Sequence, residues 1–164
     1  MTDEQPGAGQ IWLARADRGP DPDRGSDLYV LVTEVHPGHV QALLCGEECN
    51  LATDTDSVLE PRATGVPRRL LVHGDLAGTI LNDRLTQLMG SVTPALVQRI
   101  VLRGRGLDFH SSDLGRGKPI ADDSDPRWNW KLEQLRQLRR VRASARELGW
   151  ELYKLGDPAA ERTA

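Results

Sequence analysis

The apolar positions in the first part of the chain have the spacing of β-strands. Residues 10–16 alternate apolar and polar side chains, which is the period of a strand with one buried face. Residues 28–35 form a continuous aliphatic and β-branched run, typical of a central strand. Residues 36–39, His-Pro-Gly-His, have the composition of a tight turn, and 40–45 are apolar again. The pattern predicts one strand followed by a β-hairpin.

Two further strands are expected after a polar, irregular connection at 46–65. Residues 68–74 combine two arginines with an apolar run, and we expect this strand to end at Gly74, where the backbone can bend. Residues 84–92 predict another strand, with a close backbone approach at Gly90. The first hundred residues therefore contain four or five short strands.

A helix is predicted to begin immediately after these strands. Thr93 is a good N-cap, Pro94 fits the first helical position, and the residues that follow have apolar side chains at helical spacing. Short strands closed by one helix are typical of a small β-barrel. We expect residues 9–103 to form this barrel with its capping helix, after a disordered tail at 1–8.

The C-terminal part has a different pattern. Residues 104–124 are rich in glycine and charge and lack apolar periodicity, which predicts a flexible linker. Residues 125–156 predict one long amphipathic helix, because apolar residues recur there every three or four positions. Such a stripe must be buried, either on the barrel or on a second copy of the chain. The stripe consists of Leu138, Val141, Ala145, Leu148, Leu152 and Leu155.

Composition limits the class of protein. The chain has 164 residues, of which 38% are hydrophobic and only 4% aromatic, so we expect one domain of ordinary size with an aliphatic core. Two cysteines are too few for a disulfide framework. The N-terminus lacks the apolar core of a signal peptide, and no apolar run is long enough to span a membrane. A cytoplasmic location is therefore expected.

Charge is distributed unevenly along the chain. The formal net charge is −3, yet residues 126–156 hold eight arginines or lysines against three glutamates. The remaining residues carry the compensating negative charge. The helix is thus a basic appendage that either contacts nucleic acid or lies against its own acidic barrel.

Three familiar kinds of site are disfavoured by the sequence. His36, His39, Cys45 and Cys49 are all potential zinc ligands. An extended strand at 40–45 would separate the second histidine from the first cysteine by roughly 20 Å, and we expect no metal site. The Gly-Arg-Gly-Lys-Pro segment near Lys118 lacks the frame of a phosphate-binding loop, and no serine-hydrolase elbow is present.

His73 and Asp75 are the remaining candidates for chemistry. They flank Gly74 at the expected strand end, so both side chains can point to the same side. A histidine beside a carboxylate can act as general base and acid, which suffices to cleave RNA by attack of a 2′-hydroxyl on the adjacent phosphate. The alternative is a surface histidine paired with an ordinary turn aspartate.

The layout resembles the MazF/PemK toxin family. The similar pieces are an opening strand at 9–17, a second strand at 29–35, and above all residues 70–101, with their strand, aspartate, Arg-Leu, strand ending in glycine, and capped helix. Residues 104–164 have no counterpart in the resemblance. It implies an α+β fold with an SH3-like β-barrel. It also implies a dimeric, metal-independent endoribonuclease that an antitoxin neutralises.

The resemblance also implies site residues. Asp75 matches an aspartate of the RNA site in some members, and His73 falls where those members carry a basic residue. The family usually begins its second strand with a catalytic Arg-Pro, and here that position is Leu28-Tyr29. The family's threonine at the end of the third strand is likewise replaced, by Leu44-Cys45-Gly46. The nearest substitutes or contacts are Arg24 as a catalytic cation and Arg15, Arg18 and Trp12 as nucleic-acid-binding residues.

Three functions remain open on this sequence. The first is a toxin-type, RNA-binding endoribonuclease without cofactor, working as a homodimer with an antitoxin partner. The second is a catalytically inactive barrel of the same kind that binds nucleic acid or protein. The third is a structural subunit that assembles through its C-terminal helix and whose barrel carries out no chemistry. The two missing family positions favour the second, and the His73–Asp75 pair favours the first.

Overall fold

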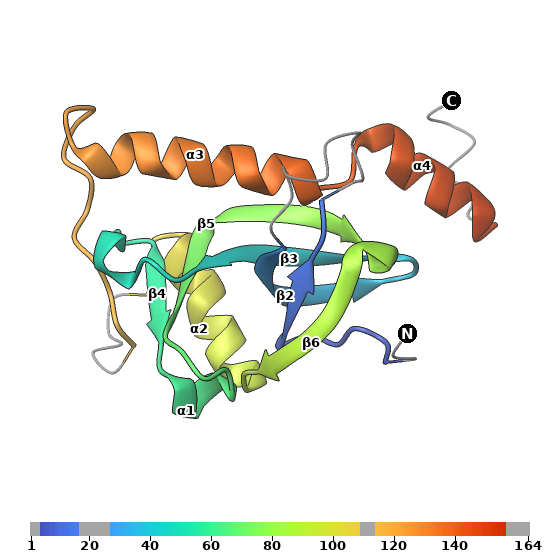
Figure 1. Cartoon of the computed structure of the whole chain (residues 1–164), viewed down its shortest axis with the longest axis horizontal. Helices are drawn as coiled ribbons and strands as arrows, with labels where there is room; N and C mark the ends of the chain where they lie inside the picture. Colours follow the sequence, from blue (N-terminus) through green and yellow to red (C-terminus); the bar gives the residue numbers. More distant parts are fainter. Residues whose placement is uncertain (1–3, 17–26, 109–113, 157–164) are drawn as a thin grey trace.

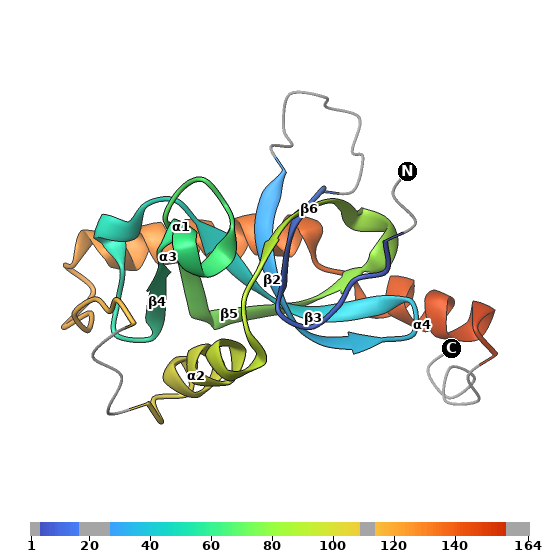
Figure 2. The ribbon, with the colours of Figure 1, turned by 90° about the horizontal axis from the view of Figure 1, so that it is seen from below.

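A computed structural model describes residues 4–16, 27–108 and 114–156. Its core is a six-stranded antiparallel sheet in the order β4-β5-β3-β2-β1-β6, so β4 and β6 are its edges. The sheet curves strongly, with helices α2 and α3 on opposite sides (Figures 1 and 2). This confirms the α+β class and the small barrel-like domain with a capping helix. The strands are β1 Gln10–Ala14, β2 Leu28–His36, β3 His39–Gly46, β4 Asp56–Leu59, β5 Leu70–Leu81 and β6 Leu85–Ser91.

The helices are mostly short, and the main ones lie in the C-terminal half. The α-helices are α1 Pro61–Thr64, α2 Pro94–Gly104, α3 Pro126–Val141 and α4 Ala145–Lys154, with 3-10 turns at Cys49–Leu51 and Asn82–Arg84. Within the described part of the chain, no helix has both the length and the apolar character needed to cross a membrane.

The predicted hairpin and the predicted capping helix are both confirmed. Strands β2 and β3 pair up to the His36–His39 positions, and Gly38 takes the left-handed conformation that the turn requires. Helix α2 begins at Pro94, and the Thr93 hydroxyl accepts a hydrogen bond from the Leu96 amide at 3.3 Å. Local chemistry at these two places was sufficient to predict the structure.

Strand β5 is longer than the sequence predicts. It continues through Gly74 and runs from Leu70 to Leu81. The glycine serves a different purpose there, because a Cβ at position 74 would collide with the Thr55 carbonyl oxygen and would lie 2.6 Å from the Gly104 Cα atom. Gly74 therefore permits close packing inside the strand, and the expectation that the strand ends there is wrong.

Two groups of buried residues cover the two faces of the sheet. The first joins the sheet to α2 through Val97 and Ile100. The second joins it to α3 through Leu138 and Val141, which are almost completely buried among residues of β1, β2, β3 and β5. Leu138 and Val141 of the predicted stripe are thus buried against the barrel, whereas Ala145 and Leu155, in and after α4, are exposed. The buried pair makes α3 part of the hydrophobic core.

The helical segment 125–156 is divided, whereas the sequence predicts one helix. The chain is extended at Arg142, and the Ala143 amide donates a hydrogen bond to the Thr79 carbonyl of β5 at 2.8 Å. Ser144 then caps α4: its hydroxyl accepts from the Glu147 amide, and the Glu147 carboxylate accepts from the Ser144 amide at 2.7 Å. This reciprocal capping box starts a new helix and explains the break.

Candidate active site

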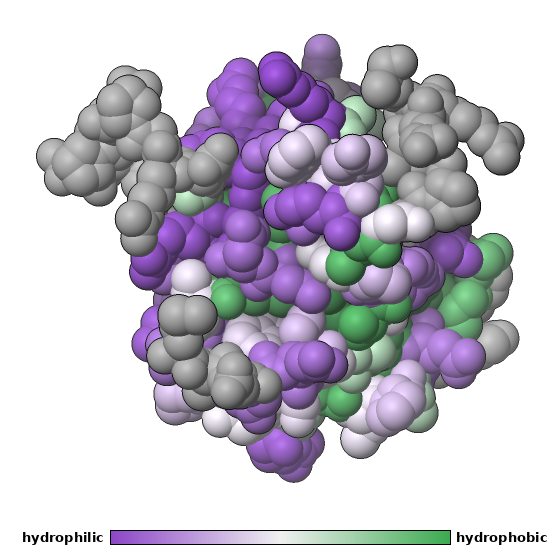
Figure 3. All heavy atoms as spheres, turned by 90° about the vertical axis from the view of Figure 1, so that its right-hand side faces the viewer, coloured by the Kyte–Doolittle hydropathy of each residue, from purple (hydrophilic) through white to green (hydrophobic). Residues whose placement is uncertain are grey.

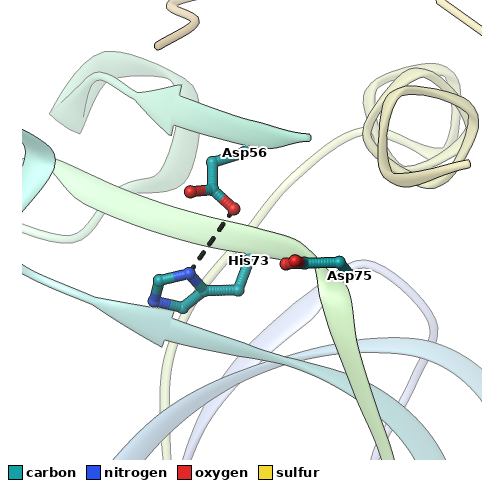
Figure 4. Close-up of side chains that lie close together, drawn as sticks. All are labelled: Asp56, His73 and Asp75. Atoms are coloured by element: carbon teal, nitrogen blue, oxygen red, sulfur yellow. Dashed lines mark ion pairs between the residues drawn. The ribbon is translucent and has the colours of Figure 1, made fainter. Parts of the chain in front are cut away.

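Four charged or titratable side chains from three elements meet between the sheet and α3. Asp56 lies on β4 directly opposite His73 on β5, and Asp75 follows two residues later on the same face of β5. Lys131 enters from α3. Figure 4 shows the imidazole of His73 turned toward Asp56, with Asp75 further along the strand. We call Asp56, His73, Asp75 and Lys131 the β5 cluster.

The ammonium group of Lys131 lies at the centre of the β5 cluster. Its Nζ atom is 2.6 Å from Asp56 Oδ1, 2.8 Å from Asp75 Oδ1 and 3.0 Å from His73 Nδ1. An ammonium has three N–H donors and no acceptor, so these three contacts use all of them. Lys131 therefore has no donor left for a phosphate group.

The protonation of His73 follows from these contacts. Because Lys131 can only donate, Nδ1 accepts, and in the neutral ring the proton is assigned to Nε2. Asp56 Oδ1 is 3.5 Å from the same Nδ1 atom. Nε2 is buried without a hydrogen-bond partner among the described residues, and the ring packs against Trp130 at a centroid distance of 5.1 Å. The lone pair that a general base needs is therefore occupied by Lys131.

Asp56 is held as a carboxylate. Its Oδ2 atom accepts hydrogen bonds from the Thr53 amide at 2.9 Å and the Thr53 hydroxyl at 3.0 Å. Burial by itself would raise the pKa of Asp56, but the hydrogen bonds and the positive charge within the β5 cluster outweigh it. The pKa of Asp56 consequently lies below its ordinary value of 3.8.

Access to the β5 cluster is limited. Asp56 and His73 are 0% exposed, whereas the side chain of Asp75 is 41% exposed and that of Lys131 is 10% exposed. The sequence places His73 at an accessible strand end. In the structure it lies inside the protein, because β5 continues and α3 covers this part of it. Asp75 alone connects the cluster to solvent.

The donor atoms of Asp56, His73 and Asp75 are close enough to surround one cation. One ligand atom from each lies within 4.8 Å of the others. Two carboxylates and an imidazole are ligands that several transition metals accept. The Lys131 ammonium lies between these atoms, so a metal ion and the lysine would compete for the same space.

The other predicted site residues lie elsewhere. Trp12 is buried in the core beneath α3, and its Nε1 donates to Gln10 Oε1 at 3.0 Å. Arg15 follows β1, which β2 and β3 separate from β5, and its Nε is 3.5 Å from Asp27 Oδ1. The structure therefore does not bring either residue to His73. Arg18 and Arg24 are outside the described residues.

Sequence reasoning missed Asp56 and Lys131. Asp56 stands in a polar segment that gives no clear strand pattern. Lys131 gives a readable signal, because it precedes Leu135, Leu138 and Val141 by helical steps and so occupies a position of the buried stripe. A lone lysine on the buried face of a helix indicates a carboxylate opposite it.

The fold and the β5 cluster together define a small curved-sheet α+β protein with a largely buried cluster of charged and titratable side chains between the sheet and α3. The sequence matches no family model, and a search of curated proteins also gives no match. Among solved structures, it is similar to an endoribonuclease in complex with its cognate antitoxin from a mycobacterial species, with 23% identity and a TM-score of 0.43. A second mycobacterial endoribonuclease gives 20% identity and a TM-score of 0.47. In both cases the match covers 67% of this chain and 100% of the other.

Proposed function

We propose that this chain is a toxin-type endoribonuclease of a toxin–antitoxin system, and that the β5 cluster is its acid–base centre. One observation carries the proposal: His73 Nδ1 lies 3.5 Å from the buried carboxylate of Asp56, and the solvent-reaching carboxylate of Asp75 has an oxygen within 4.8 Å of ligand atoms of both residues. The resemblance of residues 70–101 to the MazF/PemK family supports the same site. In the closed arrangement Lys131 blocks it, so activity requires the lysine to leave.

The chemistry needs no metal ion. With Lys131 withdrawn, His73 Nδ1 can take the proton of a ribose 2′-hydroxyl, whose oxygen attacks the adjacent phosphorus. Asp56 stabilises the resulting imidazolium, and Asp75 orients the hydroxyl from the solvent side. The imidazolium then returns the proton to the 5′-oxygen as the P–O bond breaks. The products are a 2′,3′-cyclic phosphate and a 5′-hydroxyl.

The rate is expected to be low. The lysine of the β5 cluster has no N–H donor free to bind the phosphate in the transition state. Loss of one such donor lowers the rate of an enzyme by a factor of about 10²–10³. Arg24 is the proposed substitute for the family's arginine. Replacing Arg24 by Gln should then lower the cleavage rate without changing stability.

An RNA cleavage assay on the purified full-length chain with a chelator present tests the proposal. We compare the wild type with Lys131→Met, which keeps the apolar stem and removes the ammonium, and with Lys131→Met combined with His73→Ala. Cleavage should rise in the first variant and disappear in the second. Circular dichroism checks that each variant is folded. If folded Lys131→Met does not cleave RNA under any condition where a control nuclease does, the proposal is wrong.

A catalytically inactive binding module is the second candidate. The complete burial of His73 favours it, together with the insertion of Leu138 and Val141 into the core, which ties α3 firmly to the sheet. An open groove of about 810 Å³ between α2 and strands β2, β3 and β5 offers a place for a ligand. It is lined by polar and apolar residues that include Thr33, Gln41, Ala77 and Gln98. Growth arrest on expression supports the enzyme, and harmless expression with retained RNA binding supports the module.

An antitoxin partner and a homodimer belong to the same proposal. One of the structural neighbours is described in complex with its cognate antitoxin. A sizing column on the full-length chain distinguishes a dimer from a monomer. The antitoxin is tested by co-expression with the gene that neighbours this one, which should relieve growth arrest.

A further inference from the structure

Most basic residues of α3 and α4 make no ion pair with carboxylates of the barrel among the described residues. Among the described residues of these two helices, Lys131 is the basic residue that bonds to carboxylates of the sheet. Arg127 pairs with Asp125 at the start of its own helix, and Arg136 pairs with Glu133 one turn away. Glu147 even brings a negative charge toward the barrel, where it pairs with Arg84. Docking on an acidic barrel therefore does not explain the basic composition.

Three arginines of this segment are unpaired. Arg139, Arg142 and Arg146 are exposed, and their guanidinium groups have no hydrogen-bond or ion-pair partner among residues 4–16, 27–108 and 114–156. They lie within eight consecutive residues around the break between the helices. Because no carboxylate of the described residues pairs with these arginines, this surface favours an anionic partner.

Exposed aromatic rings accompany these arginines. Trp150 is 60% and Tyr153 is 58% exposed, and their rings stack on each other with centroids 5.6 Å apart and an interplanar angle of 19°. Arg146, Trp150 and Tyr153 follow one another at helical steps of four and three, which places them on one face of α4. Figure 3 views the molecule from the side on which α4 lies in Figure 1. Hydrophobic residues gather there between hydrophilic ones.

We propose that the exposed surface around and after the break between α3 and α4, formed by Arg139, Arg142, Arg146, Trp150 and Tyr153, binds single-stranded nucleic acid. Guanidinium groups pair with backbone phosphates, and flat exposed rings stack on unpaired bases, which is the combination that single-strand-binding surfaces use. A second copy of the chain fits this face poorly. A two-fold contact centred on the arginines would place the arginines of one copy against those of the other. The binding face is separate from the β5 cluster, so it does not depend on cleavage.

Fluorescence anisotropy with labelled 2′-O-methyl oligouridine tests the proposal on the full-length chain. This strand lacks the 2′-hydroxyl nucleophile, so the measurement is independent of ribonuclease activity. The test variant is Arg139→Gln, Arg142→Gln, Arg146→Gln. The charge-matched control is Arg62→Gln, Arg68→Gln, Arg69→Gln, three exposed arginines at and after α1, which lies on the opposite side of the barrel from α3 (Figure 1).

The test variant should bind at least about tenfold more weakly, and its slope of log affinity against log salt should fall by about 2, because each phosphate contact on a single strand contributes about 0.7. The control variant should keep most of the affinity. Equal losses in both variants, or no binding by the wild type at low salt, would overturn the proposal.

The aromatic part is tested separately. Trp150→Ala with Tyr153→Ala should weaken binding by about tenfold without changing the salt slope. Leu155→Ala, which removes exposed apolar surface from the same end of α4, should have little effect. Oligothymidine in parallel identifies whether RNA or DNA is preferred, and a preference for either supports the proposal. A different result would contradict the proposal and assign this surface to an acidic protein. In that case the chain binds poly-glutamate through the arginines and not the rings, and it binds neither oligonucleotide.

Discussion

The ammonium of Lys131 lies 2.6 Å from the carboxylate of Asp56, a residue 75 positions earlier in the chain. This contact joins α3 to β4, an edge strand of the sheet. It also places a positive charge beside His73 and Asp75. The same lysine therefore contributes to the docking of α3 and restricts access to His73.

Replacing Lys131 tests the first of these roles. Lys131→Ala leaves the buried carboxylate of Asp56 without its closest counter-charge, and removing one partner of a buried pair costs about 3–5 kcal/mol. We expect a loss of this order in the free energy of unfolding measured in urea. Lys154→Ala, which breaks an exposed pair with Glu151, should cost about 0.5 kcal/mol or less.

A double variant separates charge from packing. Lys131→Met with Asp56→Asn removes both charges of the pair and should recover part of the stability lost in Lys131→Met alone. If the two changes simply add, the coupling between these residues is absent.

The pKa of Asp56 predicts how stability depends on pH. Its pKa is lower in the folded protein than in the unfolded chain, so the folded state is stabilised above the unfolded value. That stability is lost as the pH falls through the folded value. The free energy of unfolding should thus decline from about pH 4 downward, since an unfolded aspartate titrates near 3.9. Asp56→Asn should make the free energy of unfolding depend less on pH below about pH 4. The control is Asp123→Asn at an exposed position, which should keep the pH dependence of the wild type.

The two cysteines should differ in reactivity. Cys45 is buried in the core, and burial raises the pKa of its thiol to about 12. The thiolate is the nucleophile, so native Cys45 should resist iodoacetamide, while the partly exposed Cys49 is alkylated. Mass spectrometry should find one adduct on the native protein and two after unfolding. Rapid modification of Cys45 in the native protein would contradict its burial.

Two glycine substitutions should change the free energy of unfolding in opposite directions. Gly74→Ala forces a Cβ against the Thr55 carbonyl and Gly104, so it should destabilise the protein by several kcal/mol, beyond the ~1–3 kcal/mol typical of overpacking. At Gly149, inside α4, a Cβ would meet no atom within 4 Å. Gly149→Ala should therefore stabilise the protein by about 0.5–1 kcal/mol, because alanine is the better helix former. Thermal denaturation of both variants checks whether the melting temperature falls in Gly74→Ala and rises in Gly149→Ala.

The parts of the fold that could be predicted are those encoded by neighbouring residues. The turn at Pro37-Gly38 and the helix start at Thr93-Pro94 depend on three or four consecutive side chains. The start of α4 belongs to the same class, because Ser144 and Glu147 carry the spacing of a capping box. The apolar stripe of 138–155 nevertheless predicts a single helix, because the spacing of its apolar residues continues across the break between α3 and α4.

The composition of the β5 cluster could not be predicted in the same way. His73 and Asp75 were identified from their spacing, but Asp56 joins them only through the pairing of β4 with β5. Lys131 joins them only through the docking of α3. Contacts between residues 56 to 75 positions apart depend on strand register and helix placement, which a single sequence does not contain.

The insertion of Leu138 and Val141 into the barrel has a consequence for biosynthesis. The ribosome makes all six strands before it makes α3, and domains generally begin to fold while the chain emerges. A nascent chain from which residues 126–141 have not yet emerged thus presents a bare aliphatic sheet surface and an uncovered His73. Release of these residues allows α3 to cover both.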